Sequence, residues 1–360
     1  MDDSSAPGFR VLHLSFHQGC INEIEWLAGA MSLQLTSWYI PSCENARPFD
    51  GCSEGSALYN IGRERARRVW ELHEKYFRQF DVVITSDTAP LARIFLQNAW
   101  TKPLIVWICN RFDYSDQATL DCDFPDERYY ELFRAATSME NVRLVSYTRY
   151  EQLYAGARGV DIGDRLIRPS GGGALAPGEP VAPLVPSHVA RSDTLFLYPR
   201  LSEDEVRYVV KSCERAGITL YHGSYRCPED LEDFRGVLYF PYAYSNFALF
   251  ENIQLGIVHF VPDEDFLRAL GQQPDTPMRV LPNLGLCEWY APENRDLFVY
   301  FRSWEDLSRK LRTTPYPTLR RHIRNRARVH QRATLHQWHK VFAELTPFAP
   351  GGAEFPQLVY

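Results

Sequence analysis

Apolar positions in the first half of the chain fall into short runs that alternate with amphipathic stretches. Residues 9–16, 80–85 and 103–109 are rich in β-branched and aromatic side chains and predict strands. Strands that are apolar along their whole length and alternate with helices are typical of a parallel sheet covered on both faces. The other elements predicted here are strands at 33–40 and 142–146 and helices at 22–31, 60–79, 90–97, 126–137 and 148–155.

The pattern stops between residues 169 and 192 and then begins again. This segment, PSGGGALAPGEPVAPLVPSHVARS, is dense in proline, glycine and alanine and predicts a linker. The second half predicts strands at 194–198, 219–221, 236–240, 257–261 and 298–301, and helices at 202–216, 228–234, 246–255, 264–270, 304–311 and 317–345. We therefore expect an α/β protein with two Rossmann-like, doubly wound domains facing a cleft, 1–168 and 193–335, with 336–360 packing back on the first.

Composition narrows the class of protein. The chain has 360 residues, 45% hydrophobic and 23% charged, which is ordinary for a globular protein. No apolar run approaches the roughly 18 residues of a membrane span, and the start, MDDSSAPGFR, has no apolar signal stretch. We expect a cytoplasmic protein, soluble or peripheral on a membrane. The net charge of −6 argues against a nucleic-acid partner, and eight cysteines without a CxxC pair predict free thiols.

Charge is unevenly distributed at the C-terminal end. From Leu307 to Ala343 there are eight arginines, two lysines and no acid. Such a helix has three interpretations: a solvated face, a contact with an anionic membrane surface, or assistance in binding phosphate-bearing ligands.

The loop and helix after the predicted strand 236–240 are the most informative stretch. Ser245 and Asn246 are good N-cap residues for the next helix, whose free N–H groups would favour an anion. Glu251 lies about one and a half turns into that helix between apolar neighbours, so it either faces solvent or binds something specific, such as ribose hydroxyls.

This order of strand, polar loop, helix with one glutamate and then LGIVHFVP resembles the donor site of GT-B glycosyltransferases. The resemblance implies that Glu251 binds the ribose of a nucleotide sugar, and that Ser245 and Asn246 bind its diphosphate. The run LFVYFRSWEDLSRKLR and the helix after it are similar to the end of these enzymes, where the last helix crosses back to the first domain. Ala243 stands where the retaining subgroup has a second glutamate, which disfavours that subgroup.

The resemblance implies transfer of a sugar from a donor such as a UDP- or GDP-sugar to a hydroxyl of a glycan or other acceptor, with inversion and without a metal. A non-hydrolysing sugar-nucleotide epimerase and a non-catalytic, two-lobed sugar-binding protein remain alternatives.

Two further strand ends suit a nucleotide. Arg200 is the last residue of the segment LFLYPR, which follows on from the predicted strand 194–198. Its permanently charged guanidinium can bind a diphosphate there or pair with Glu203 or Asp204. In YHGSYR, Gly223 permits close approach of the backbone and Tyr225 can stack on a base, although an ordinary turn explains the segment equally well. The remaining donor candidates are Ser224 and Tyr244.

Three loops of the first half offer a general base for the acceptor hydroxyl. We rank Asp113, in the NRFD segment, before Asp87 and His17. Asp87 is equally placed as an N-cap, and Asp113 can instead pair with Arg111, which otherwise supports the diphosphate or an acidic acceptor. Arg168, near the predicted linker, either touches ligand or holds the linker.

Several motifs are absent from the sequence. It contains no GxGxxG after a strand, no P-loop, no GxSxG elbow, no HExxH and no paired Cys/His spacing. The triplet Asp121–Cys122–Asp123 has the form of a metal motif but stands in a loop, where it predicts an acid cluster. We therefore expect no resident metal.

Overall fold

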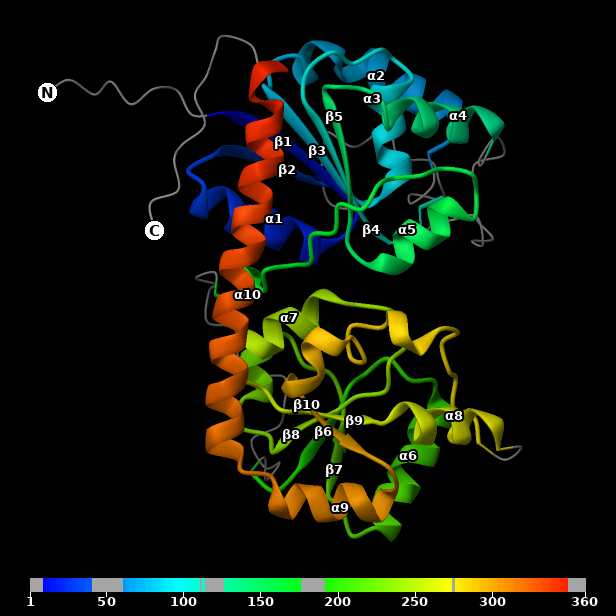
Figure 1. Ribbon diagram of the computed structural model, residues 1–360, viewed down its shortest axis with the longest axis vertical. Helices are drawn as coiled ribbons and strands as arrows, with labels where there is room; N and C mark the ends of the chain where they lie inside the picture. The colour runs from blue at the N-terminus through cyan, green and yellow to red at the C-terminus, as the bar shows by residue number, and fades with distance from the viewer. Residues whose placement is uncertain are drawn as a thin grey trace, which may run out of the picture. The chain divides into compact units, whose positions relative to one another are not determined.

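The computed structural model describes residues 9–40, 61–110, 112–113, 126–175, 192–273 and 276–348. The chain divides into two compact units, each with its own sheet (Figure 1): unit 1 is Met1–Pro169 with Ala333–Tyr360, and unit 2 is Ser170–Arg332. Among the described residues, no helix is long and apolar enough to cross a membrane.

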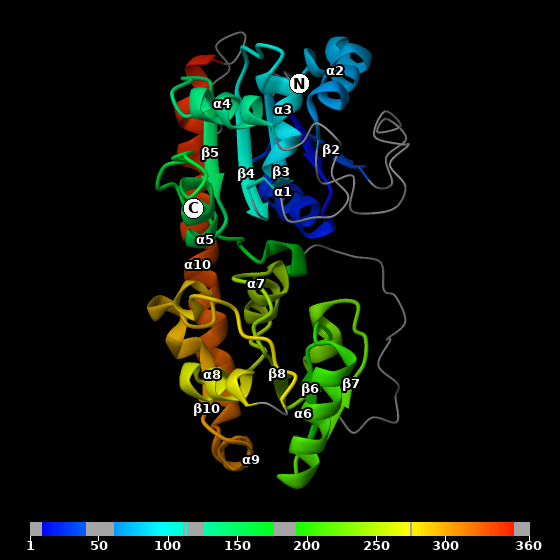
Figure 2. The ribbon, with the colours of Figure 1, turned by 90° about the vertical axis from the view of Figure 1, so that its right-hand side faces the viewer.

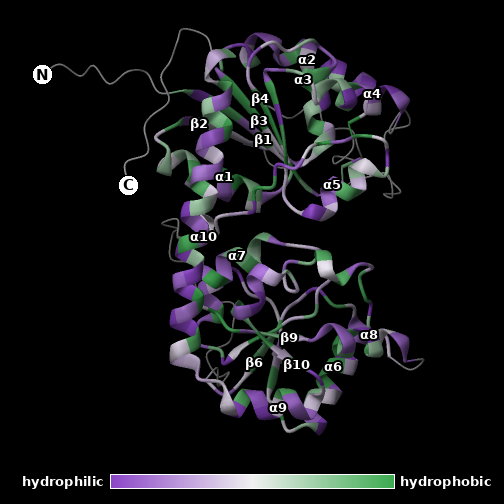
Figure 3. Cartoon of the chain, viewed as in Figure 1, coloured by the Kyte–Doolittle hydropathy of each residue, from purple (hydrophilic) through white to green (hydrophobic). Residues whose placement is uncertain are grey.

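Unit 1 contains a five-stranded parallel sheet in the order β2-β1-β3-β4-β5. Its strands are β1 (Arg10–Ser15), β2 (Gln34–Tyr39), β3 (Val82–Thr88), β4 (Leu104–Asn110) and β5 (Val142–Ser146). Its helices are α1 (Gln18–Ala30), α2 (Arg63–Phe77), the 3₁₀ turn η4 (Ala89–Ala92), α3 (Arg93–Leu96), α4 (Glu127–Ala136) and α5 (Arg149–Gly156). Figure 3 shows β1, β3 and β4 largely hydrophobic, as a sheet covered on both faces requires.

The two faces of this sheet pack against different helices. Leu12, Val83 and Val106 share a buried cluster with side chains of α2, α3 and α4. Because side chains alternate along a strand, Trp107 points to the opposite face, where its ring meets Trp338 edge-on at 5.4 Å.

Unit 2 contains a second five-stranded parallel sheet, in the order β10-β9-β8-β6-β7. Its strands are β6 (Leu195–Leu197), β7 (Leu220–His222), β8 (Gly236–Leu238), β9 (His259–Pro262) and β10 (Phe298–Phe301). Its helices are α6 (Glu203–Arg215), α7 (Phe247–Gln254), α8 (Glu264–Gln272) and α9 (Trp304–Thr313), with 3₁₀ turns η5 (Gly172–Leu175), η6 (Pro228–Leu231), η7 (Leu284–Leu286) and η8 (Pro292–Leu297). The prediction of two doubly wound α/β halves is confirmed.

The last helix, α10 (Tyr316–Leu345), contributes to both units and is followed by η9 (Thr346–Phe348). Ile323 and Ala327 are buried in the core of unit 2. Trp338 is buried against unit 1, where Figure 2 shows the end of α10 beside β5 and Glu344 forms an ion pair with Arg143 (2.7 Å). The helix therefore leaves the second unit and returns to the first, as the sequence predicts.

Three local predictions differ from the structure. Thr85–Asp87 are not a loop, because β3 continues to Thr88 with a register shift between Asp87 and Thr88. Only the short 3₁₀ turn η6 forms where a helix is predicted at 228–234. The first residues of the predicted linker are packed: Gly171 has φ +73°, and a Cβ there would lie 2.3 Å from the carbonyl oxygen of Phe250 in α7. Only glycine fits this approach.

Candidate functional site

In unit 2, the carboxyl ends of β6, β7 and β8 bring several predicted donor residues together. Arg200, just beyond β6, is hydrogen-bonded to Tyr198 and lies near the hydroxyls of Tyr225 and Tyr242. Tyr225, beyond β7, donates to the hydroxyl of Tyr198 at 3.4 Å. Burial, with the charge of Glu251 nearby, raises the pKa of Tyr225 to about 12. A cation, a carboxylate and aromatic rings therefore share this sheet edge.

Neither Glu203 nor Asp204, the alternative partners of Arg200, forms an ion pair with it among the described residues. Asp204 pairs with Arg207 at 3.1 Å. Within the described part of the chain, Arg200 makes no ion pair with a carboxylate, and its side chain is exposed. An exposed guanidinium at a strand end is available to an anionic ligand.

The start of α7 lies at the same edge. Asn246 is its N-cap, and Asn246 Oδ1 accepts from the backbone N–H of Leu249 at 2.7 Å. Asn246 Nδ2 donates to the hydroxyl of Tyr239 at 2.7 Å. Ser245 Oγ is buried and has no hydrogen-bond partner among the described residues. The loop therefore offers a hydroxyl and the N-terminal turn of a helix, which together suit a phosphate.

Aromatic side chains that sequence reasoning missed pack against one another at this sheet edge. Tyr198 packs on Tyr239 with ring centroids 4.8 Å apart, and Tyr242 is nearly parallel to Tyr198 at 6.1 Å. Trp289 stacks on Tyr239 at 4.3 Å. Burial raises the pKa of Tyr198 and of Tyr239, which keeps both hydroxyls protonated. The repeated tyrosines of LFLYPR and YFPYAY were the signal that could have found them.

The remaining donor candidates are less central. The hydroxyl of Tyr244 donates to the carbonyl of Pro282 at 2.7 Å, so this side chain holds a neighbouring loop. Gly223 lies against the ring of Tyr221: a Cβ there would come within 2.5 Å of the Tyr221 hydroxyl. Ser224 is exposed beside it.

In unit 1, the corresponding sheet edge carries His17, Asp87 and two cysteines. His17 is exposed and is the N-cap of α1, where its Nδ1 accepts from the N–H of Gly19 at 3.0 Å. Cys20 is buried in the first turn of α1, and its Sγ lies 3.8 Å from that of Cys109 at the end of β4. All five cysteines in the described ranges are free thiols.

Asp87 is buried in an unusual backbone conformation. Its φ is +72°, a region that non-glycine residues rarely adopt, and it stands at the bulge of β3. Burial, with the charge of Cys20, raises the pKa of Asp87 to about 8, although His17 and a hydrogen bond with Asn110 oppose the shift. Asp87 is therefore mainly neutral at pH 7 and is not the N-cap that its sequence context suggested.

Asp113 is fully buried and bound on all sides. Its Oδ2 accepts from the hydroxyl of Tyr130 at 2.8 Å, and its Oδ1 accepts from the hydroxyl of Tyr154 at 2.8 Å. Arg158 completes the set with an ion pair. This geometry is typical of a structural carboxylate, with Arg158 as its cation.

Arg111 and Arg168 are the two arginines expected to support the ligand. Arg111, the predicted partner of Asp113, lies outside the described residues. Arg168 is half-buried, and its carbonyl accepts from Thr334 Oγ1 at 3.4 Å in α10. The backbone of Arg168 therefore helps to hold α10 on unit 1.

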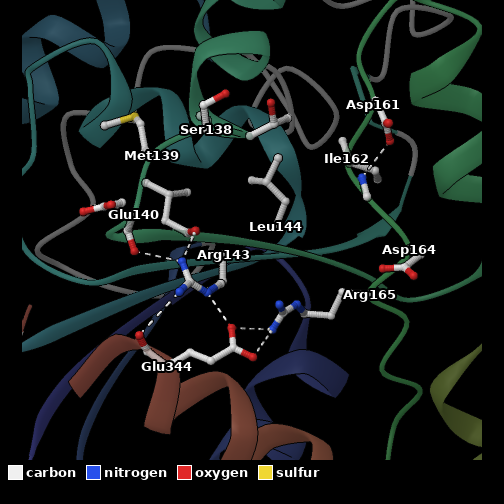
Figure 4. Close-up of a pocket in the computed structure, with 14 residues that line it drawn as sticks. Ser138, Met139, Glu140, Arg143, Leu144, Asp161, Ile162, Asp164, Arg165 and Glu344 are labelled. Carbon is white, nitrogen blue, oxygen red and sulfur yellow. Dashed lines mark hydrogen bonds and ion pairs between the residues drawn. The ribbon is translucent and has the colours of Figure 1, made fainter. Parts of the chain in front are cut away.

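A polar cavity of about 610 Å³ lies at the other edge of the unit 1 sheet, where β5 begins (Figure 4). Arg143 and Arg165 both pair with Glu344, at 2.7 and 3.1 Å, and Asp161 accepts from the N–H of Gly163 at 2.9 Å. Because Arg143, Arg165 and Glu344 pair with one another, we assign these side chains to holding α10 on unit 1 rather than to binding a ligand.

The described ranges contain no group of three or more His, Cys, Asp or Glu side chains arranged to hold a metal ion. The Asp121–Asp123 triplet lies outside them.

Comparison with known proteins is informative only at the level of structure. No protein-family model matches the chain, and no curated protein matches it in sequence. The glycotransferase of kitacinnamycin is similar in structure, with 12% identity, a TM-score of 0.52, and 94% of this chain and 99% of that one covered.

Two plant proteins give weaker superpositions. Arabidopsis thaliana UGT89C1, complexed with UDP-L-rhamnose, has 12% identity and a TM-score of 0.48, covering 94% of this chain and 99% of that one. A UDP-glucosyltransferase from Polygonum tinctorium capable of glucosylating indoxyl has 9% identity and a TM-score of 0.48, covering 95% and 99%. The full-length match to the first structure, with two five-stranded parallel sheets and a returning C-terminal helix, shows that the chain has the GT-B fold.

Proposed function

We propose that the protein is a glycosyltransferase that uses a nucleotide-diphosphate sugar, such as a UDP- or GDP-sugar. The observation that carries the proposal is the group formed by Arg200, Tyr225, Glu251 and the N-terminal turn of α7 at one sheet edge of unit 2. Ligands of open α/β sheets bind beyond the carboxyl ends of the strands. The GT-B fold, shared with a glycotransferase, supports the same class of reaction.

Each donor residue has a role that follows from its chemistry. Glu251 accepts hydrogen bonds from the ribose hydroxyls, and the flat ring of Tyr225 or Tyr242 stacks on the base. Arg200 and Ser245 Oγ bind the diphosphate together with the backbone N–H groups of α7. Ser224, Gly223 and Tyr244 border this group and shape the loops around it.

We assign the general base to unit 1 and now prefer His17. It is exposed and carries an imidazole, the side chain most often used as a general base, whereas Asp113 is buried with three partners and Asp87 is buried and mainly neutral. Arg168 keeps a supporting role, because its carbonyl helps to hold α10 on unit 1.

The proposed reaction is an inverting displacement without a metal. His17 Nδ1, released from the Gly19 N–H, takes the proton of an acceptor hydroxyl while the hydroxyl oxygen bonds to the anomeric carbon. The bond from that carbon to the diphosphate breaks with its electron pair, and the leaving diphosphate is stabilised by Arg200 and the α7 N–H groups. The acceptor is a hydroxyl of a glycan or of another acceptor molecule.

The test is nucleotide binding by the full chain, followed by transfer. We expect one of UDP, GDP or CDP to raise the melting temperature by several degrees and the corresponding sugar nucleotide to serve as donor. Glu251→Ala should weaken that nucleotide roughly 10- to 100-fold, since hydrogen bonds to a charged group are lost. Glu214→Ala, an exposed acid of α6, is the matched control.

The proposal fails if no nucleotide shifts the melting temperature, or if Glu251→Ala and Glu214→Ala bind it equally well. Release of free nucleotide with an epimerised sugar, rather than transfer, would favour the epimerase.

We further propose peripheral contact between the C-terminal helix and an anionic membrane. Arg320 and Arg324 donate to the carbonyls of Phe234 and Leu255, at 2.8 Å each, so part of the basic charge is structural. Arg321, Arg328 and Arg332 are exposed and follow one another at helical spacing. Replacing these three by glutamine should abolish sedimentation with phosphatidylserine vesicles; sedimentation equal to that of the unmodified protein would exclude this surface.

A further inference from the structure

Two cysteines from different elements lie side by side at the sheet edge that carries the proposed base. Cys20 stands in the first turn of α1, and Cys109 stands near the end of β4. The two sulfurs are 3.8 Å apart, with the thiol of Cys20 donating to the sulfur of Cys109. Both cysteines are free, so this is a reduced pair of thiols in contact.

The irregularity in the sheet determines where Cys109 lies. At the register shift after Asp87, β4 has one residue more than β3, and this extra residue is Cys109. An extra residue of this kind bends the strand and re-aims a side chain. The Cys109 thiol also donates to the carbonyl of Trp107 at 3.5 Å. The position of Cys109 beside Cys20 is therefore part of the strand geometry.

The two thiols differ in their access to solvent. Cys20 is fully buried, whereas Cys109 is partly exposed. A small oxidant in solution therefore reaches the sulfur of Cys109 first, and the sulfur of Cys20 stands behind it. An accessible thiol next to a second, resolving thiol is the arrangement in which oxidation ends as a disulfide.

Cys20 is connected to the proposed base through the backbone. The carbonyl of His17 accepts from the N–H of Cys20 at 3.1 Å, and His17 Nδ1 accepts from the N–H of Gly19 at 3.0 Å. A movement of Cys20 therefore moves the turn that holds His17. The sulfurs of a disulfide are about 2.05 Å apart, so closing the present gap of 3.8 Å brings them nearer by about 1.8 Å.

We propose that Cys20 and Cys109 form a peroxide-sensitive site, at which a reversible disulfide between them displaces His17 and switches sugar transfer off. The effect on transfer rests on the proposed function, whereas the formation of the disulfide does not.

The oxidation takes two steps. The sulfur of Cys109 loses its proton and attacks one oxygen of hydrogen peroxide, the O–O bond breaks, and a sulfenic acid and water form. The sulfur of Cys20 then gives up its proton and attacks the Cys109 sulfur, and the hydroxyl of the sulfenic acid leaves as a second water. The two thiols lose two electrons, and the peroxide gains them.

The rate of the first step depends on pH. Burial raises the pKa of the Cys109 thiol well above its ordinary value, and the thiolate is the nucleophile. Oxidation should therefore be slow at pH 7 and roughly tenfold faster at pH 8. Equal rates at the two pH values would overturn the assignment of Cys109 as the sulfur that meets the peroxide.

Mapping of the disulfide tests the site without any substrate. Digestion with trypsin and with a protease that cleaves after glutamate releases Cys20 in peptide 11–23 and Cys109 in peptide 94–111, each without another cysteine. After peroxide treatment of the full chain, we expect these peptides to be linked with a loss of about 2 Da, and dithiothreitol to separate them. The site is overturned if they stay separate, or if either is linked to another cysteine instead.

The effect on transfer is measured on the same samples. We expect peroxide to lower the rate of transfer about 10- to 100-fold, since a base displaced by about 1 Å loses its alignment, and dithiothreitol to restore the rate. Cys109→Ser should transfer sugar like the unmodified protein and should keep that rate in peroxide. Cys227→Ser removes another partly exposed thiol, in unit 2, and should lose activity in peroxide as the unmodified protein does.

Cys20→Ser is the second variant and keeps the test valid if Cys109→Ser does not fold. It too should keep its rate of transfer in peroxide. The switch is overturned if both variants lose activity as fully as the unmodified protein, or if the linked peptides form and transfer continues at the untreated rate.

Failure of the proposed function has a different signature. If the untreated chain transfers no sugar from any sugar nucleotide, the proposed function is wrong and the effect on transfer falls with it. The linked peptides still form in that case, because the disulfide needs only the two sulfurs and the peroxide.

Discussion

Two acidic residues that follow strands in the sequence have opposite surroundings in the structure. Glu251 is half-buried beside Tyr225, at an edge that also carries an exposed arginine. Asp113 is fully buried, and Tyr130, Tyr154 and Arg158 occupy its oxygens. A carboxylate whose oxygens are all engaged cannot accept a substrate proton without losing those bonds, so Asp113 stabilises the fold.

Asp113→Asn should therefore lower the stability of the fold while leaving the rate of sugar transfer unchanged. The change removes the negative charge that pairs with Arg158 and weakens the hydrogen bonds that the hydroxyls of Tyr130 and Tyr154 donate. We expect a loss of about 2–4 kcal/mol in the free energy of unfolding, measured by urea denaturation. The rate of transfer per folded molecule should stay near that of the unmodified protein.

Asp164→Asn is the control for this prediction, since Asp164 is an exposed acid of the same unit. It should change stability by less than about 0.5 kcal/mol. A loss of transfer greater than about 100-fold in folded Asp113→Asn would instead restore Asp113 as the base.

Local features of the candidate site could be predicted from sequence, and nonlocal ones could not. Asn246 was identifiable because an N-cap is set by neighbours within one helical turn. The contact of Cys20 with Cys109 joins residues 89 positions apart, and no spacing rule indicates it. Sequence reasoning therefore found His17 but not this pair of thiols.

At the scale of elements, hydrophobic periodicity predicted the order of strands and helices, with errors where polar residues are buried. The run Thr85–Ser86–Asp87 has a loop composition, yet it lies in β3, where Ser86 is hydrogen-bonded to His13. Thr85 Oγ1 and Asp87 Oδ2 are buried there without a hydrogen-bond partner among the described residues. The positive φ of Asp87 has no sequence signal, since it depends on the bulge against β4.

The packing of α10 on α7 depends on one glycine. Gly256 follows α7 with φ +73°, and a Cβ there would lie 2.8 Å from the carbonyl oxygen of Arg320 and 2.9 Å from the Arg324 side chain. Gly256→Ala should therefore cost both backbone strain and displacement of α10, about 2–4 kcal/mol in all. Urea denaturation measures the loss.

Gly217→Ala separates these two causes. Gly217 has φ +67° but nothing within 4 Å of a built Cβ, so only the strain of about 1–2 kcal/mol applies. Equal losses in the two variants would mean that contact with α10 contributes nothing at position 256.

At the scale of the whole molecule, the sequence indicated two halves and a returning helix, but not which residues fasten that helix. The anchoring side chains of α10 in unit 1 are Trp338, buried against Trp107, and Glu344, paired with Arg143 and Arg165. Trp338 was recognisable as part of an apolar stripe, whereas its partner on β4 follows only from the tertiary fold.

Because each unit has its own sheet and core, loss of an anchor should act on one unit. Trp338→Ala removes a fully buried ring and should destabilise unit 1 by about 3–5 kcal/mol. Hydrogen exchange followed by mass spectrometry should then show faster exchange in peptides of β4, with little change in β9.

Trp304→Ala is the corresponding change in unit 2, where the half-buried Trp304 ring packs with Phe240, Phe266 and Phe301 at 6.0–6.2 Å. It should speed exchange in β9 and leave β4 protected. If either variant speeds exchange equally in both strands, the two units unfold as one body and α10 transmits the loss. Selective effects would show that α10 joins two units that each unfold on their own.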